Sequence, residues 1–235
     1  MAKFYGIGTG PGNSELLTMK AVHTLEKLDV LYTPEPKKGG TSLALKIVSP
    51  YLPEKLTVKQ RHFPMSYNKE EKEQAWERIA AEIKEDVLSE KNAGFITLGD
   101  PMIYSTYSYL LELLQTEVET ETIAGISSFS YIASRIGWPI VMDEESLAVI
   151  PVTSGEAAVN QALTHFHTII LMKAASNMPL VLRLLDKHQL LEKAVLVSNA
   201  SMVSEKITYG LEHLHDDEKL SYFSTIIVKK KGRVT

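Results

Sequence analysis

The sequence predicts two α/β domains, with a mainly parallel sheet in the N-terminal domain and a mixed sheet in the C-terminal one. In the first half of the chain, short apolar runs alternate with longer amphipathic segments, which is typical of strand–helix repeats that build a parallel sheet. In the second half these segments are shorter and less regular. We therefore divide the chain into residues 1–120 and 121–235, and we expect a ligand cleft between the two domains.

The composition is that of an ordinary globular protein. Of the 235 residues, 44% are hydrophobic and 23% are charged, so the chain can bury a sizeable core. The net charge of -4 argues against a broad nucleic-acid-binding surface, and the lack of cysteine excludes disulfides and thiolate chemistry. Because the sequence shows neither a signal-peptide pattern nor an apolar run of membrane-spanning length, we expect a cytoplasmic protein.

In the first half, the spacing of apolar residues and the positions of cap and turn residues predict the helices and strands. Apolar residues at helical spacing and a possible N-cap at Asn13 or Ser14 indicate the first helix, and a single apolar stripe among many charges indicates that 69–89 is a surface helix. The loop 34–40 is basic and is expected to be flexible. Strands are expected at 3–7, 30–33, 56–60 and 94–98, and helices at 14–28, 42–49, 69–89 and 107–114.

The second half is also predicted to contain alternating strands and helices, but they are spaced less regularly. A helix begins after Ala124-Gly125-Ile126-Ser127-Ser128, where small hydroxyl residues can cap the helix or bind a ligand. Lys229-Lys230-Lys231 reads as a frayed basic tail. Strands are expected at 119–123, 147–150, 169–172, 194–197 and 222–228, and helices from about 128 to 136, 156 to 163 and 179 to 186.

Two glycine-bearing loops follow expected strands and are the first places to look for chemistry. Gly6-Ile7-Gly8-Thr9-Gly10-Pro11-Gly12 fails the dinucleotide fingerprint, which needs glycine at Pro11, and it also lacks the lysine of a phosphate-binding loop. Gly99-Asp100-Pro101 ends a buried strand, and ligands of open α/β sheets bind at such ends. There Gly99 allows close backbone approach, and Asp100 is a hydrogen-bond acceptor.

Other kinds of chemistry have little support. The pairs His165/His167 and His213/His215 have strand spacing but no evident third ligand, so no metal site is predicted. The sequence has no Gly-x-Ser-x-Gly elbow to anchor a hydrolase triad. No catalytic residue is assigned.

Four stretches together resemble the tetrapyrrole methylase family, with the C-20 methyltransferases of cobalamin biosynthesis as the most similar subgroup. The glycine loop and the Gly-Asp-Pro turn are features of the whole family, whereas the second and fourth stretches point to the C-20 subgroup. Asn13 departs from the family, which often has aspartate there. The stretches are residues 6–18 (GIGTGPGNSELLT), 97–106 (TLGDPMIYST), 125–129 (GISSF) and 222–228 (YFSTIIV).

The resemblance implies a homodimeric two-domain enzyme that binds S-adenosylmethionine as methyl donor and methylates C-20 of precorrin-2 or cobalt-factor II. Sequence does not tell whether the tetrapyrrole acceptor carries cobalt. Neither a nucleic acid nor a membrane is implied as a partner. By motif, the cofactor contacts would be Pro11, Leu98, Gly99, Asp100, Ile103, Ser127, Ser128, Met172 and Ala200, with Ser105 and Thr106 close by.

The acceptor implied by the resemblance carries several carboxylates, so a few cations should line its site. The candidates are Lys37, Lys38, Arg61, Arg135 and Lys173. Two other functions stay open. The chain could be a methylase of the same fold that acts on another tetrapyrrole carbon or another acceptor, or it could be a metabolite-binding protein without turnover.

Overall fold

The computed structural model describes residues 1–35, 42–63, 69–215 and 219–231. It divides into two compact units, Met1–Ser127 and Ser128–Thr235. Each unit is an α/β layer structure with one five-stranded sheet, in agreement with the predicted fold class. The expected boundary between residues 120 and 121 falls inside a strand of the first sheet, whereas the units meet after Ser127.

The first unit has a wholly parallel sheet of order β3-β2-β4-β1-β5. Its strands are β1 (Phe4–Gly8), β2 (Val30–Glu35), β3 (Thr57–His62), β4 (Ala93–Thr97) and β5 (Thr120–Ile123). Its helices are η1 (Ser14–Leu16), α1 (Met19–Leu25), α2 (Leu43–Val48), η2 (Ser49–Tyr51), α3 (Lys69–Leu88) and α4 (Tyr107–Leu114), where η marks a short 3-10 helix.

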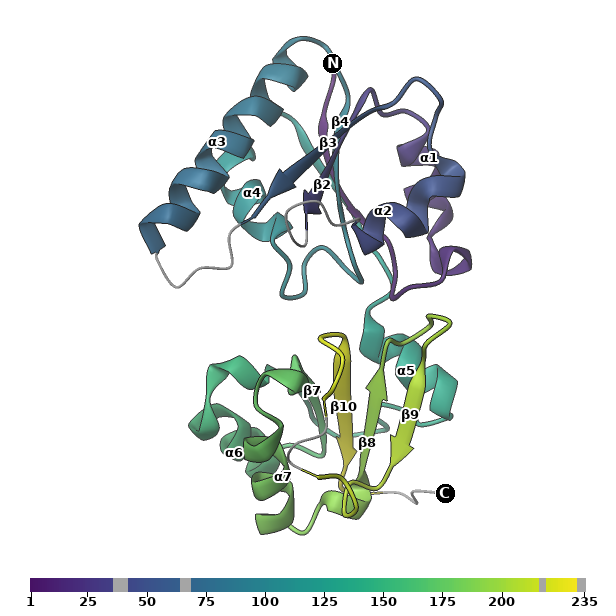
Figure 1. Cartoon of the computed structure of the whole chain (residues 1–235), viewed down its shortest axis with the longest axis vertical. Coiled ribbons are helices and arrows are strands. Elements are labelled where there is room, and N and C mark those ends of the chain that lie inside the picture. The colour runs from purple at the N-terminus through teal and green to yellow at the C-terminus, as the bar shows by residue number, and fades with distance from the viewer. Residues whose placement is uncertain (36–41, 64–68, 216–218, 232–235) are drawn as a thin grey trace. The chain divides into compact units, whose positions relative to one another are not determined.

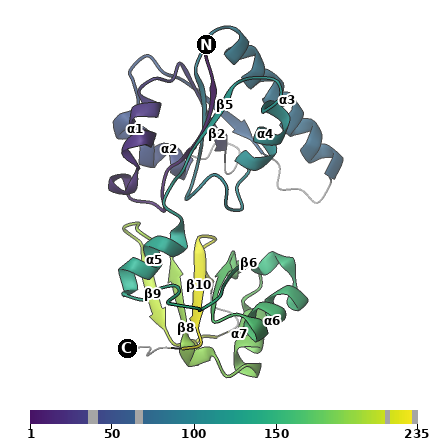
Figure 2. The same cartoon turned by 180° about the vertical axis from the view of Figure 1, so that it is seen from behind.

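Helices cover both faces of this sheet, so its central strands β1 and β4 are buried and apolar, as parallel sheets require, whereas the edge strands β3 and β5 are more polar and more exposed. Figure 1 shows α3 and α4 on one face and α1 and α2 on the other. Each layer has its own core. Phe4, Phe95 and Tyr107 are buried in the α3/α4 layer, and Ile7 and Ile96 are buried against α1 and α2. The view from behind in Figure 2 shows β5 at the edge of the sheet.

The first helical segment is shorter than the continuous helix expected over 14–28. The chain forms η1, which Asn13 caps through the backbone N–H of Glu15, and then restarts as α1 with Thr18 as its N-cap. The Thr18 hydroxyl accepts a hydrogen bond from the Ala21 N–H at 3.1 Å. The sequence does not indicate Thr18 as a cap, because an uninterrupted apolar period hides a break between two helices.

We expect Thr18→Ala to lower the free energy of unfolding by about 1 kcal/mol, because the Ala21 N–H loses its partner at the start of α1. Asn13→Ala is the matched control: it removes the same kind of cap from a single exposed 3-10 turn and should cost less. Chemical denaturation of the two variants measures the difference. Equal losses would contradict this account of α1.

The second unit has a mixed sheet of order β6-β7-β10-β8-β9, in which only β6 and β7 run parallel as neighbours. Its strands are β6 (Leu147–Pro151), β7 (Thr168–Met172), β8 (Ala194–Ser198), β9 (Lys206–Tyr209) and β10 (Ser224–Lys229). Its helices are α5 (Ser128–Ile136), η3 (Val152–Ser154), α6 (Glu156–His165), η4 (Ala174–Ser176), α7 (Met178–Lys187) and η5 (Leu191–Lys193).

The core of the second unit lies between the sheet and α6 and α7, while α5 packs on the other face beside β10 (Figure 1). Strands β7 and β10 supply fully buried aliphatic side chains such as Ile169 and Val228. Strand β9 was not predicted individually, because KITY alternates weakly and lies in a polar region.

The basic segment near the C-terminus is not a frayed tail as far as it is described. Lys229 is the last residue of β10, and its ammonium lies 3.3 Å from a Glu145 carboxylate oxygen and also donates to the Pro139 carbonyl. The Lys230 N–H donates to the His167 carbonyl. The prediction was wrong because three consecutive lysines look solvated, yet their backbone continues a central strand whose long side chains reach acceptors.

Candidate functional site at the carboxyl ends of the strands

In the first unit, three strand-end loops meet at one edge of the sheet. Strands β4, β1 and β5 are adjacent and parallel, so the loops that follow them leave from the same side. Gly10 and Gly99 form an isolated antiparallel bridge, in which the Gly99 N–H donates to the Gly10 carbonyl at 2.8 Å and the Gly10 N–H to the Gly99 carbonyl at 3.3 Å. The two loops are therefore joined through their main chains.

The third loop packs against the first two without side chains between them. A Cβ added at Gly125 would lie 2.1 Å from the Gly99 carbonyl oxygen, and one added at Gly8 would lie 2.7 Å from the same atom. Real Cβ atoms do not approach backbone so closely, so both positions require glycine. Gly8, Gly99 and Gly125, together with Gly10, form what we call the glycine junction.

Gly99 differs from the other glycines of the junction because it faces open space. Its φ is +68°, and a Cβ there would meet only the Cα of Ser127, at 3.9 Å. A ligand can thus lie directly on the main chain at this point, flanked by the half-buried side chains of Leu98 and Ile103. This open, backbone-lined place suits a nucleoside-type cofactor such as S-adenosylmethionine, which offers both polar groups and an apolar surface.

Asp100 fastens the junction together. Its Oδ1 accepts a hydrogen bond from the Met102 N–H at 2.8 Å, and its Oδ2 accepts one from the Gly125 N–H at 3.0 Å. The carboxylate therefore links the loop after β4 to the loop after β5. In the structure its first role is that of a positioning residue, since both oxygens already accept backbone hydrogen bonds.

We expect Asp100→Ala to weaken binding of S-adenosylhomocysteine by at least about tenfold, because the two charge-assisted hydrogen bonds from the N–H groups of Met102 and Gly125 are lost. The same change should also lower the free energy of unfolding by about 1–3 kcal/mol. Isothermal titration and chemical denaturation measure these quantities. Asp100→Asn keeps one acceptor oxygen, so its affinity for S-adenosylhomocysteine and its free energy of unfolding should lie between those of Asp100→Ala and the wild type. Unchanged affinity in Asp100→Ala would remove Asp100 from the site.

The remaining predicted residues of the first unit lie on these loops or at the start of α4. The Ser105 hydroxyl donates to the Thr97 hydroxyl at 3.1 Å and accepts from the Tyr107 N–H at 3.1 Å, so it starts α4 and ties it to β4. The structure brings eight of the predicted residues to this edge: Pro11, Leu98, Gly99, Asp100, Ile103, Ser105, Thr106 and Ser127.

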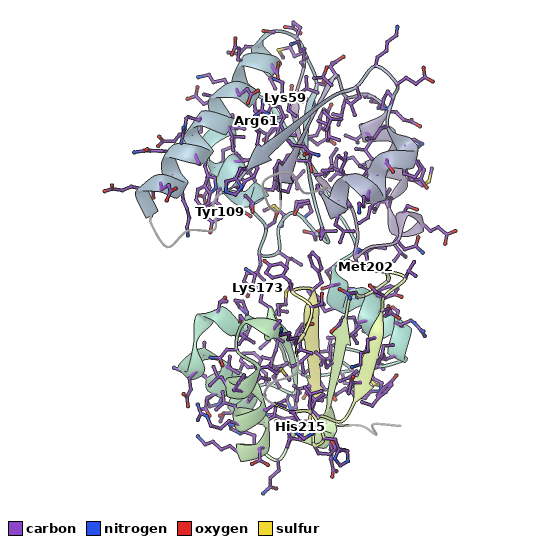
Figure 3. The ribbon with its side chains drawn as sticks, in the orientation of Figure 1. Lys59, Arg61, Tyr109, Lys173, Met202 and His215 are labelled. Carbon is purple, nitrogen blue, oxygen red and sulfur yellow. The ribbon has the colours of Figure 1, made fainter. Side chains whose placement is uncertain are left out.

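The second unit holds the other three predicted residues, Ser128, Met172 and Ala200. Ser128 is the first residue of α5, Met172 ends β7, and Ala200 follows β8. Strands β7 and β8 both run antiparallel to β10, so Met172 and Ala200 lie at the same edge of this sheet. In Figure 3, Lys173 and Met202 mark this edge of the second unit, and His215 lies at its opposite end.

Backbone strain is concentrated at this edge of the second sheet. Lys173, Asn199 and Ser201 all have left-handed φ values, of 55°, 54° and 62°. Such conformations are costly for residues other than glycine and occur preferentially at functional sites. Three residues with left-handed backbone therefore lie beside Met172 and Ala200.

Glu205 contributes to this site although nothing in the sequence singles it out. Its Oε2 accepts the Ser201 N–H at 2.7 Å, and its Oε1 accepts from Arg135 Nε at 2.9 Å. Burial raises the pKa of Glu205, but these hydrogen bonds and one with Tyr131 outweigh burial and lower it overall. The carboxylate stays ionised and holds the loop after β8. Glu205 lies four residues after Ser201 and belongs to no recognised motif, so the sequence gives no signal for this role.

Two of the five candidate cations form ion pairs with carboxylates of the same chain. Arg61 forms a two-pronged pair with Glu82, and Arg135 pairs with Glu205, so both have structural partners. Lys173 lies at the strand-end edge of the second unit. Lys37 and Lys38 lie outside the described residues.

The described ranges contain neither a cluster of metal ligands nor a helix that could cross a membrane. There, no group of three or more His, Cys, Asp or Glu side chains could hold a metal ion. His167 Nδ1 instead lies 2.9 Å from the Ser146 hydroxyl. Over the same ranges, no helix has the length and apolar character needed to cross a membrane.

Residues 3–213 match the family model described as Tetrapyrrole (Corrin/Porphyrin) Methylases. The chain is 42% identical over 229 residues to a cobalt-precorrin-2 C(20)-methyltransferase of Salmonella typhimurium, with 97% of each chain covered. It is 36% identical over 236 residues to a probable cobalt-precorrin-2 C(20)-methyltransferase of Methanocaldococcus jannaschii, with 98% of this chain and 97% of the relative covered.

Among solved structures, the methyltransferase CobJ has a similar fold. The TM-score is 0.76 at 16% sequence identity, and the similarity covers 97% of this chain and 94% of that one.

Proposed function

Since this chain belongs to the tetrapyrrole methylase family, we propose that it is an S-adenosylmethionine-dependent methyltransferase that methylates C-20 of precorrin-2 or its cobalt complex in cobalamin biosynthesis. The observation that carries the proposal is the similarity to the Salmonella enzyme, which covers 97% of this chain and therefore extends over both units. Cytoplasmic location and a homodimeric state belong to the same proposal.

The glycine junction supports S-adenosylmethionine as the methyl donor. The open main chain at Gly99 and the apolar side chains of Leu98 and Ile103 offer a place for a nucleoside. We propose that the eight residues named in the first unit, together with Ser128, Met172 and Ala200, make the contacts to the donor. Most of these contacts would come from backbone groups, because six of the eleven residues are glycine, alanine, proline or serine in turns or helix starts.

The reaction makes modest chemical demands on the chain. S-adenosylmethionine supplies an electrophilic methyl group on a sulfonium, and the acceptor supplies an electron-rich carbon. The side chains and main chain of the site then have to hold the two reactants in line and exclude water, which is catalysis by proximity and orientation. Loops fixed by Asp100 and Glu205 are suited to this task, because they are cross-linked by hydrogen bonds at both strand-end edges.

Within this function we propose the cobalt-containing acceptor. Both relatives named above carry cobalt-precorrin-2 in their names, at 42% and 36% identity. The metal would then be part of the substrate, so the chain needs no metal ligands of its own to hold it.

A transfer assay tests the function. The protein is incubated anaerobically with S-adenosylmethionine carrying a ¹³C methyl group and, in parallel, with metal-free precorrin-2 or cobalt-factor II. The expected result is label at C-20, formed faster with the cobalt acceptor, and one S-adenosylhomocysteine released for each methyl transferred.

Other outcomes would separate the alternatives. Label at a different carbon would identify a methylase of the same fold with another regiochemistry. Tight binding of S-adenosylhomocysteine without transfer to either acceptor would contradict the proposed reaction and favour a metabolite-binding protein.

A further inference from the structure

Two large aromatic side chains are exposed side by side at the start of β10. Tyr222 is 61% exposed and Phe223 is 39% exposed, and their rings meet edge to face with centroids 5.3 Å apart. Together they expose far more aromatic surface than a turn needs for folding. Aromatic rings of this kind commonly serve as contact surfaces for flat ligands.

A network of serine and asparagine hydrogen bonds holds this turn in place. The Ser221 hydroxyl donates to Asn199 Oδ1 at 2.6 Å and accepts the Phe223 N–H at 3.2 Å. The Ser224 hydroxyl donates to the Ser221 carbonyl at 2.6 Å and lies 2.8 Å from the buried Ser198 hydroxyl. The aromatic pair is therefore presented on an ordered base, and ordering the two rings on ligand binding costs little entropy.

Strand register places the pair in the middle of the candidate site of the second unit. Strand β10 lies between β7 and β8, with Ser224 opposite Ser198 and the Asn199 N–H bonded to the Phe223 carbonyl. Continuing the same register brings Tyr222 opposite Ala200. On the other side, Ile226 is opposite Leu171, so Ser224 comes level with Lys173.

We propose that Tyr222 and Phe223 form an aromatic platform that contacts the tetrapyrrole ring of the acceptor and determines how tightly it binds. The inference rests on the proposed function and deepens it by assigning residues to the acceptor. A tetrapyrrole combines a large, flat, partly conjugated ring with several carboxylates. The platform matches the ring, and Lys173, at the same edge, matches the charge.

Two other occupants fit the observations less well. The methyl donor already has its proposed contacts at the glycine junction, Met172 and Ala200, so the exposed rings are left for the other reactant. A second copy of the chain would cover the platform with protein, yet the surroundings are polar strand-end loops rich in serine and asparagine, unlike the apolar centre of an obligate interface. Both occupants are included as outcomes of the test.

The test compares Tyr222→Leu/Phe223→Leu with the wild type. Leucine keeps an apolar side chain but removes the ring. Tyr209→Leu is the matched control, because Tyr209 is 46% exposed on the same sheet but pairs with Val195, near the other end of β8. The measurements are the affinity for cobalt-factor II by absorption titration, the affinity for S-adenosylhomocysteine by calorimetry, the melting temperature and the mass in solution.

We expect the double variant to bind cobalt-factor II roughly tenfold or more weakly, which is the size of one lost stacking contact. Its affinity for S-adenosylhomocysteine and its melting temperature should stay near those of the wild type, and Tyr209→Leu should change neither affinity. The conservative exchange Tyr222→Phe/Phe223→Tyr keeps both rings and should restore binding of the acceptor.

Several results would overturn the inference. Unchanged affinity for cobalt-factor II in the leucine variant would do so while leaving the proposed function intact. A selective loss of S-adenosylhomocysteine binding would assign the rings to the donor, and a change of mass in solution would assign them to an interface between copies. A wild-type protein that binds S-adenosylhomocysteine but neither precorrin-2 nor cobalt-factor II would overturn both the inference and the proposed function.

Discussion

Gly125→Ala is expected to lower the free energy of unfolding by about 3 kcal/mol or more and to abolish detectable binding of S-adenosylhomocysteine. The reason is steric: the new Cβ would lie 2.1 Å from the Gly99 carbonyl oxygen, and only backbone can move to relieve the contact. Any such movement pulls the loop after β5 away from Asp100, whose carboxylate holds the Gly125 N–H. Chemical denaturation and calorimetric titration measure the two effects.

Gly99→Ala is the matched control within the same junction. Its Cβ would enter open space, so the cost to stability is the strain of a left-handed alanine alone, on the order of 1 kcal/mol. Binding of S-adenosylhomocysteine should nevertheless weaken, because the methyl group would occupy the place proposed for the ligand. If the alanine at residue 125 destabilised the protein no more than the alanine at residue 99, the close packing of the junction would be refuted.

Asp86→Ala should be the most damaging change outside the site, with an expected loss of about 3–5 kcal/mol. Asp86 is only 6% exposed on α3 and accepts hydrogen bonds from the Tyr32 hydroxyl at 2.7 Å, from Lys59 at 2.7 Å and from Lys91 at 3.1 Å. Removing the carboxylate leaves a fully buried phenol without this acceptor and takes a counter-charge from Lys59. Denaturation with urea at pH 7 measures the loss.

The same carboxylate predicts a dependence of stability on pH. Burial alone would raise the pKa of Asp86. The hydrogen bonds from Lys59, Tyr32 and Lys91 lower it by more than burial raises it, so the pKa in the folded state lies below the ordinary 3.8. A group with a depressed pKa stabilises the fold fully above its unfolded pKa and loses that contribution as the pH falls through its folded pKa. Stability should therefore fall below about pH 4.

Asp86→Asn serves as the control for this pH effect. The amide keeps the size of the side chain and an acceptor for Tyr32 but cannot titrate. Its stability should be lower than that of the wild type at pH 7, and the difference between the two proteins should shrink as the pH is lowered from 5 to 2. A difference that stays constant over this range would show that Asp86 is not the titrating group.

Most of the fold could be predicted from the sequence because its helices and strands are long or are bounded by clear turn residues. The helix expected at 107–114 coincides with α4, and the apolar runs that became β4 and β7 are bounded by turn residues. The failures have local physical causes. The break between η1 and α1 occurs because Thr18 takes an extended backbone conformation and caps α1. Strand β9 is short and half-exposed. The Thr18 cap is a local contact within one helical turn that the apolar period conceals, whereas β9 depends on pairing with β8, which a local pattern does not report.

The candidate site was predictable in position but not in its internal connections. The loops after Gly8 and Leu98 were expected to approach a ligand, and the structure shows that they also bond to each other. The double use of the Asp100 carboxylate and the role of Glu205 depend on neighbours distant in sequence or outside any motif. Likewise, Arg61 was one of five candidate cations for the acceptor, but its partner Glu82 is visible only once β3 and α3 are packed together.

The bridge between Gly10 and Gly99 has a consequence for how acceptor preference can diversify on this scaffold. Where a ligand rests on main-chain atoms, amino-acid replacement cannot tune the contact: any replacement at Gly8 or Gly125 breaks the junction, and one at Gly99 blocks it. Selectivity for the acceptor must then be encoded in side chains outside the junction. A redesign toward a new acceptor should leave these glycines untouched and vary exposed side chains such as Tyr222 instead.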